Sequence, residues 1–348
     1  MTTSQHDKSS VMRRQNRKSK KKTSLKEPVR FGFVVLVLVL YNMMANAQEI
    51  NFSRVQDMAI WYNQSLKTDK QMSLKLNYRN VNYQGLLAYN SVCAILDAPL
   101  LSKSAREKTN SGYFSMSVGG ASDKSNQGIL SNTLGMLGVS YALPISSNEI
   151  YASIGFQGMY YQSKMNTSGI AAFPDQFDQY GPINGKQSID PVASGWSYGY
   201  FNVNAGASVF SNSQYNKWYI GASMLHVNTP YTERSKSETF KAKRALSVQG
   251  GYKYITANAD ECAFNMSLNW QGNAYKHYFN LSYLKAIPNM EGGVGFGVGY
   301  RYNDAVVPNV DLKYNKATIA LLYDINISSI NAAGYRRTGL ELALKLDF

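Results

Sequence analysis

Histidine is the natural starting point for a search for chemistry, because imidazole serves both hydrolysis and metal binding near neutral pH. His6 lies in the basic N-terminal stretch, whereas His226 and His277 stand singly in strand-like segments. Neither has the spacing of a metal site, and the chain contains no G-x-S-x-G, P-loop or H-E-x-x-H motif. Some barrel hydrolases use an Asp–His pair at the barrel rim, and His226 is the candidate for such a pair. Otherwise we expect no enzyme, no cofactor and no metal.

Short segments of alternating residues are the elements that would carry these side chains. Residues 201–209, 264–270, 294–302 and 319–327 alternate large apolar with small polar residues, and Leu322 is an apolar exception in a polar row. Because side chains of a strand alternate between two faces, each segment predicts a strand with one apolar and one polar face. The polar rows are mostly Gly, Ser, Asn and Ala, which predicts a small and nearly uncharged lining.

The last nine residues give the clearest of these strands. Their apolar row ends on an aromatic residue and opposes Glu341, Ala343, Lys345 and Asp347. A lipid-facing apolar row opposite a polar row is typical of a transmembrane barrel strand, although a soluble β-sandwich can also end on an amphipathic strand. Four residues of the apolar row are predicted to form the signal that outer-membrane assembly machinery reads: Leu342, Leu344, Leu346 and Phe348.

About fourteen such strands follow one another between residues 71 and 348, separated by turn residues. We therefore predict an all-β fold, a transmembrane antiparallel up-and-down β-barrel in the outer membrane, with about twelve or sixteen strands as alternatives. Aromatic residues at the ends of apolar rows, such as Tyr254 and Trp270, suit the girdles of such a barrel. Cys93 and Cys262 are far apart in the sequence, and we expect both to be free.

Residues 1–47 have the three parts of a secretory signal peptide. Residues 1–30 hold ten Lys or Arg against two acidic residues, and an uncharged apolar run begins at Phe31. The run leads to an Ala-x-Ala site formed by Ala45 and Ala47, so we predict cleavage before Gln48. A membrane-spanning helix is the alternative, but the run falls short of the roughly 20 residues that such a helix needs.

The charge of the chain is concentrated in this N-terminal stretch. The whole chain carries +14, whereas the part after residue 47 keeps 26 basic and 20 acidic residues, a net charge of +6. A basic N-terminal tail that binds nucleic acid is an alternative, but the apolar run follows it directly. The modest remaining charge does not indicate a nucleic-acid partner.

Three stretches interrupt the rhythm of the strands. Residues 48–70 precede the first strand and include 58–62, a candidate for a short helix, so we predict a periplasmic, plug-like segment. Residues 162–196 are rich in proline, and residues 228–244 are polar and basic. Both stretches are too long for tight turns and predict long loops. Such loops suit partner contacts, but they can also be merely solvated.

Four short motifs occur in order along the chain. They read Leu-Asn-Tyr-Arg-Asn-Val-Asn-Tyr-Gln-Gly at 76–85, Gly-Phe-Gln-Gly-Met-Tyr-Tyr-Gln at 155–162, Phe-Pro-Asp-Gln-Phe-Asp at 173–178 and Tyr-Asp-Ile-Asn-Ile-Ser-Ser-Ile at 323–330. With the closing strand, they resemble the PorP/SprF family of type IX secretion system outer-membrane proteins from about residue 62 onward. One segment departs from the family, because Asn-Gln-Ser-Leu-Lys-Thr at 63–68 stands where members often have Asn-Pro-Ala-x-x-Gly.

This resemblance implies a non-enzymatic barrel in the outer membrane of a diderm bacterium, surrounded by outer-membrane lipid. It implies two kinds of partner: secreted adhesin or gliding-motility proteins with a type IX C-terminal sorting domain, and peptidoglycan-associated periplasmic components of the secretion system. One alternative is an outer-membrane porin or transporter for small or hydrophobic solutes, and another is a structural barrel without a dedicated partner. The expected partner contacts lie in the two long loops: Asp175, Gln176, Phe177, Asp178, Arg234, Lys236 and Lys241.

Overall fold

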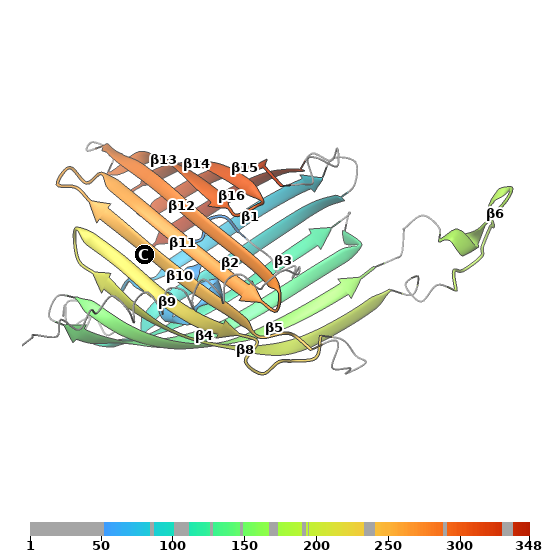
Figure 1. The fold of residues 1–348 in the computed structure, drawn as a ribbon, viewed down its shortest axis with the longest axis horizontal. Coiled ribbons are helices and arrows are strands. Elements are labelled where there is room, and N and C mark those ends of the chain that lie inside the picture. The colour runs from blue at the N-terminus through green and yellow to red at the C-terminus, as the bar shows by residue number, and fades with distance from the viewer. Residues whose placement is uncertain are drawn as a thin grey trace, which may run out of the picture. The chain divides into compact units, whose positions relative to one another are not determined.

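Fourteen strands of the described residues close into one antiparallel barrel in this computed structural model (Figure 1). The structure describes residues 52–83, 87–100, 111–125, 128–146, 149–166, 173–189, 193, 195–232, 241–287, 291–328 and 337–348. The barrel strands are β1 (Ser73–Tyr83), β2 (Leu87–Leu100), β3 (Tyr113–Ser125), β4 (Leu130–Ser146), β5 (Ile150–Met165), β8 (Trp196–Asn212), β9 (Asn216–Leu225), β10 (Ala245–Ile255), β11 (Glu261–Gln271), β12 (Ala274–Ile287), β13 (Gly292–Arg301), β14 (Ala305–Tyr314), β15 (Ala317–Asn326) and β16 (Arg337–Asp347).

Each barrel strand pairs with the next one along the chain, β5 pairs with β8, and β16 returns to β1. The closing register joins Ser73 to Asp347 and Tyr83 to Arg337. Closure pairs every strand on both sides, which removes the exposed edges that an open sheet would present to lipid. The prediction of an up-and-down barrel with about fourteen strands is confirmed.

The closing strand shows how the alternation works. Leu340 and Leu342 are exposed on the outer face of β16, whereas Glu341 and Ala343 are buried on its inner face. The same pattern runs around the barrel, where large apolar side chains such as Phe156 lie exposed on the outside. An apolar outer surface is what a barrel needs in the hydrocarbon of a membrane. No helix of the described residues has the length and apolar character needed to cross a bilayer.

The two ends of the barrel differ in their connections. At one end, here called the turn end, short connections join β4 to β5, β8 to β9, β10 to β11, β12 to β13 and β14 to β15. The opposite end, the loop end, carries the long connections from β5 to β8 and from β9 to β10. The first of these contains the 3-10 helix η3 (Pro174–Gln176) and a hairpin of β6 (Phe177–Asp178) and β7 (Gly181–Pro182).

The segment before β1 lies inside the barrel. This segment, Phe52–Gln71, is called the plug below; it contains the helix α2 (Ala59–Tyr62) and the 3-10 helix η1 (Gln64–Leu66). Residues 59–66 are buried, and side chains of the plug bond to inward-facing side chains from strands on opposite sides of the lumen. The blue segment within the ring of strands in Figure 1 is this part of the chain. The lumen is therefore filled by the chain's own N-terminal residues.

Candidate functional site

The candidate site is the contact between the plug and the inner wall of the barrel. Two parts of the wall make this contact. The charged wall is the inner face of β13–β16, β1 and β2, with Arg301, Asp311, Asp324, Glu341, Lys75, Arg79 and Asp97. The neutral wall is the inner face of β4, β5, β8 and the loop-end half of β9, with Gly138, Gly155, Gln157, Gly206, Ser208, Gly221 and Ser223.

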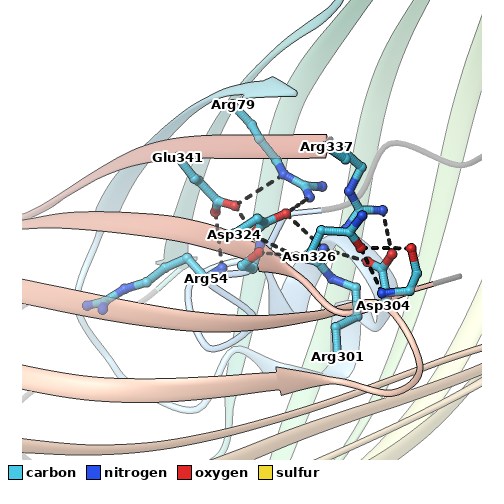
Figure 2. Close-up of polar contacts among 10 residues, drawn as sticks. Arg54, Arg79, Arg301, Asp304, Asp324, Asn326, Arg337 and Glu341 are labelled. Atoms are coloured by element: carbon cyan, nitrogen blue, oxygen red, sulfur yellow. Dashed lines mark hydrogen bonds and ion pairs between the residues drawn. The ribbon is translucent and has the colours of Figure 1, made fainter. Parts of the chain in front are cut away.

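Glu341 binds the backbone of the plug. Its side chain is only 1% exposed, and its two carboxylate oxygens accept hydrogen bonds from the amides of Ser53 and Arg54, at 2.7 and 3.1 Å. Asn77 donates a third hydrogen bond at 3.3 Å, and the Arg79 guanidinium lies 3.8 Å away (Figure 2). A carboxylate that accepts backbone N–H groups forms charge-assisted hydrogen bonds, which are stronger than neutral ones. Glu341 thus fixes the height of the plug in the lumen.

The Arg54 side chain binds a second strand of the charged wall. Its guanidinium pairs with Asp311 of β14 and with Asp57 of the plug, the latter at 2.8 Å. All three side chains are largely buried, so each charge is compensated by a partner rather than by water. The plug therefore carries its own countercharges into the lumen.

A third contact comes from Arg301, at the end of β13. Its guanidinium donates to the Ser53 hydroxyl, and pairs with Asp324 at 2.9 Å and with Asp304 at 2.8 Å. Asp324 in turn accepts from Arg79 at 2.6 Å, so a connected set of charges links β1, β13 and β15 to the plug (Figure 2). Connected charges inside a protein hold one another in fixed positions.

An apolar contact accompanies these charges. Val55 of the plug packs in one cluster with Val307 of β14 and with Ala320 and Leu322 of β15. Leu322 is the apolar exception that the sequence places in a polar, inward-facing row. The exception is explained by the plug, because Leu322 faces a buried side chain instead of water.

The neutral wall binds the carbonyl groups of the plug. Ser223 donates to the Tyr62 carbonyl at 2.7 Å, Ser208 to the Ser65 carbonyl at 2.8 Å, and Gln157 to the Ile60 carbonyl at 3.3 Å. Carbonyl groups removed from water need such partners, and a short helix leaves its last carbonyls unpaired. Small hydroxyl side chains on the wall satisfy this requirement while leaving room for the plug.

Glycines on the neutral wall let the plug approach closely. A Cβ at Gly155 would lie 2.5 Å from the Ser65 backbone nitrogen, and a Cβ at Gly206 would lie 2.2 Å from the Asn63 amide oxygen. The first contact is with backbone and is too short for any residue with a side chain, whereas the second is with a side-chain end, so a Cβ at Gly206 would require the Asn63 side chain to move. The stretch from Asn63 to Ser65 therefore fits this wall closely because the wall residues are glycines.

Lys67 ties the plug to the wall near the turn end. Its buried ammonium group pairs with Asp97 of β2 and with Asp69, the latter at 2.6 Å. Asp97 also pairs with Lys75 of β1 at 2.7 Å, and Tyr113 of β3 donates to the Lys67 carbonyl at 2.8 Å. The plug is thus held at both ends, at Ser53–Arg54 and at Lys67.

These charges correct one expectation from the sequence. The lining was predicted to be small and nearly uncharged, which describes the neutral wall but is wrong for the charged wall. The signal was present in the sequence, because Arg79, Asp324 and Glu341 all stand in polar rows opposite apolar ones. Each of these charged residues has uncharged neighbours in its own strand, so the sequence does not indicate that charged residues of different strands form ion pairs inside the barrel.

Comparison with protein-family models decides what kind of barrel this is. The model of the "Type IX secretion system membrane protein PorP/SprF" matches residues 64–345. The chain belongs to the PorP/SprF family. The match begins inside the plug and extends through nearly the whole barrel. The family description and the closed β-barrel together indicate an outer-membrane protein related to type IX secretion.

The chain was also compared with curated proteins and with solved structures. A search of curated proteins finds no match. Among solved structures, similar barrels include the "TodX deltaS2S3 mutant monoaromatic hydrocarbon channel" (7% identity, 88% of this chain and 97% of that chain, TM-score 0.49) and the Ralstonia pickettii toluene transporter TbuX (8% identity, 88% and 97%, TM-score 0.48). A Pseudomonas aeruginosa FadL homologue has 9% identity over 83% of this chain and 93% of that chain, with a TM-score of 0.49. At these values the similarity says nothing about a ligand.

Four of the predicted contact residues of the PorP/SprF chain, 175–178, lie in the hairpin of β6 and β7 and in the 3-10 helix η3 that precedes it. Asp175 accepts from the Ser188 hydroxyl at 2.7 Å and from the Ile189 amide at 2.9 Å, and these hydrogen bonds lower its pKa below the ordinary value. Gln176 donates to the Lys186 carbonyl at 2.6 Å, and Asp178 accepts from the Tyr180 amide at 2.8 Å. These polar side chains therefore shape the hairpin itself.

The exposed apolar side chains of the hairpin were not predicted as a group. Phe177 is half-exposed, and Tyr180 in the hairpin and Ile189 in its flank are each 88% exposed. Their isolated positions in a polar stretch of sequence gave no periodic signal. The hairpin and its flanks thus combine a polar, hydrogen-bonded frame with exposed apolar side chains.

The basic loop is described only in part. The Lys241 ammonium lies over the Tyr231 ring, 4.9 Å from its centre, and the two residues form an isolated β-bridge. Arg234 and Lys236 lie outside the described residues, as do Ala45, Ala47 and Gln48 of the predicted cleavage site. These parts of the prediction stay predictions.

The two histidines considered as catalytic or metal-binding residues, His226 and His277, lie among polar and aromatic side chains. The His226 Nδ1 atom is 2.9 Å from the Asn202 amide oxygen, and the His226 backbone amide donates to Asn204. His277 packs among aromatic rings, with Trp270 at 5.2 Å and Tyr275 at 5.1 Å between ring centres. The described residues contain no group of three His, Cys, Asp or Glu arranged to hold a metal ion. Cys93 and Cys262 are both free.

Proposed function

We propose that this PorP/SprF protein is a non-enzymatic barrel that secretes or anchors client proteins bearing a type IX C-terminal sorting domain. The observation that carries the proposal is the family match over residues 64–345, which includes nearly the whole barrel. The filled lumen supports it, because a barrel occupied by its own chain is poorly suited to steady diffusion of solutes. The clients would be adhesins or motility proteins.

The orientation expected for such a barrel supports a client contact at the loop end. Outer-membrane barrels carry short turns on the periplasmic side and long loops outside the cell. On this basis the loop end, with the β6–β7 hairpin, faces the cell surface, and the turn end faces periplasmic, peptidoglycan-associated components. Export would follow cleavage of a signal peptide before Gln48. The client would dock on Phe177, Tyr180 and Ile189, whose exposed apolar surface would become buried.

Co-purification tests both parts of this proposal. The protein is immunoprecipitated from detergent-solubilised outer membranes, and co-eluting proteins are identified by mass spectrometry. We expect a near-stoichiometric secreted protein with a C-terminal sorting domain. Recovery of the barrel without such a protein, under conditions that preserve other outer-membrane complexes, would contradict the proposed function.

A variant pair tests the docking surface separately. The triple variant Phe177→Ser, Tyr180→Ser, Ile189→Ser should lose most of the client while leaving Asp175 and Gln176 to hold the hairpin. The control is Tyr215→Ser, which changes an exposed aromatic residue at the opposite end of the barrel. Full client recovery with the triple variant would show that the client binds elsewhere, even if the function is correct.

A further inference from the structure

The plug contributes no strand to the barrel wall. Every barrel strand is paired with two neighbouring strands, and this ladder closes through β1 and β16 alone. The plug is attached to the wall by side chains, such as Glu341, Ser208 and Ser223, which bind its backbone. Release of the plug would therefore break side-chain contacts but no pairing between strands.

Charged groups hold the plug at two places, at the consecutive residues Ser53 and Arg54 and, beside β1, at Lys67. Glu341, Asp311 and Arg301, from three different strands, all bind Ser53 or Arg54. Hydrogen bonds to charged groups contribute more to stability than the neutral hydrogen bonds of the opposite wall. Ser53, Arg54, Glu341, Asp311 and Arg301 are called the latch below.

The lumen behind the plug has the lining of a water-filled passage. The charged wall carries both acidic and basic side chains, among them Lys75, Arg79, Asp311 and Asp324. Barrels of this class with an unfilled polar interior conduct water and ions. In the plugged state these charged side chains contact the plug or another charged side chain instead of water.

We propose that the barrel is a latched conduit, in which release of Ser53 and Arg54 from Glu341, Asp311 and Arg301 frees the plug and opens the lumen to ions and small polar solutes. This activity is separate from client binding and does not depend on the proposed function. The latch sets the equilibrium between the plugged and open states, because it holds the Ser53–Arg54 end of the plug. The Lys67–Asp97 ion pair lies beside β1, where the plug is joined to the wall through the chain itself, and the contacts between these two places are mostly single neutral hydrogen bonds and apolar packing.

The chain contains a reporter for this release. Cys93 faces the lumen from β2, is 1% exposed, and packs in one cluster with Phe52 at the latch end of the plug. Cys262, the other cysteine, is exposed on β11 and can be replaced by serine. In the Cys262→Ser background, the rate at which Cys93 reacts with a charged thiol reagent measures the fraction of molecules in which the plug has left the lumen.

The experiment compares latch variants with a matched control in proteoliposomes and planar bilayers. The double variant Glu341→Gln, Asp311→Asn keeps the shape of the latch and removes its two acidic charges. The control Glu261→Gln removes a carboxylate that Lys253 and Lys313 bind at the turn end, away from the latch. Heat-modifiable migration on gels shows which variants are folded.

We expect Cys93 to react about tenfold faster in the double variant, the change that corresponds to about 1.4 kcal/mol. Stepwise currents should accompany the faster reaction, and deletion of residues 52–66 should leave the channel open throughout. The control should keep the wild-type rate. If the double variant fails to fold, Arg54→Met weakens the latch from the plug side without altering the wall. The proposal is wrong if folded latch and deletion variants label as slowly as wild type and carry no current, or if wild type already conducts as they do.

Discussion

The charged wall and the neutral wall bind the same plug through different chemistry. On the charged wall, the buried Glu341 carboxylate accepts from the Ser53 amide, and the Asp311 carboxylate pairs with the Arg54 guanidinium. On the neutral wall, small residues provide space, and hydroxyl groups such as Ser208 provide one hydrogen bond at a time. A buried charge is costly without its partner, whereas a neutral hydrogen bond is readily replaced by water. The charged wall therefore determines the position of the plug, and the neutral wall determines its fit.

Removal of the Glu341 carboxylate is expected to have the largest effect on the plugged state, and it tests whether the charged wall determines the position of the plug. Glu341→Ala leaves two plug amides without their acceptor and Asn77 without its partner. Loss of one member of a buried charged set costs about 3–5 kcal/mol, so the plugged state should lose about this much stability. The measurement is the urea concentration at which Cys93 becomes reactive while the barrel still migrates as folded. Unchanged protection of Cys93 would assign the hold on the plug to the neutral wall.

Filling the space on the neutral wall should have a smaller effect. Gly155→Ala places a Cβ against the Ser65 backbone, and overpacking of this kind costs about 1–3 kcal/mol. The control is Gly135→Ala on β4, where an added Cβ would meet nothing within 4 Å. The same urea series compares the two variants. Equal protection of Cys93 in the two variants would show that the neutral wall adjusts to an added Cβ and does not require glycine at position 155.

The smallest effect is expected for charges that do not touch the plug. Glu261 bridges Lys253 at 2.8 Å and Lys313 at 2.6 Å, and both lysines are partly exposed near the turn end. Partly exposed pairs contribute about 0–1 kcal/mol and weaken in salt. Glu261→Gln should therefore lower stability by at most about 1 kcal/mol, and less in salt. A loss as large as that of Glu341→Ala would mean that charge alone, without plug contact, stabilises this lumen.

The barrel itself was predictable because its signal is local. Alternation with a period of two marks each strand within a few residues, and the closing strand shows it in Leu340, Glu341 and Leu342. The charged wall was not predictable in this way, because its pairs join residues such as Arg79 and Asp324 that are far apart in the chain. Leu322 was a usable signal, since an apolar residue in a lumen-facing row calls for a buried neighbour.

The hairpin of β6 and β7 gives a second example of this limit. The sequence drew attention to Asp175, Gln176 and Asp178, and the structure places all three in the loop, bonded to other residues of the same loop. Polar residues in a loop can bind a partner or stabilise the conformation of the loop, and the residue types alone do not distinguish the two roles. Only the arrangement in space separates the frame of the hairpin from the surface that it exposes.

The position of Glu341 in the chain has a consequence for the order of folding. Glu341 belongs to the last strand, and the amides that it binds lie 288 and 287 positions earlier. Loops of this length close slowly, and long-range pairing is a late step in the folding of such topologies. The same strand also completes the barrel by pairing with β1. Insertion of the plug and circularisation of the sheet should therefore be coupled, because both are completed only when the last strand is in place.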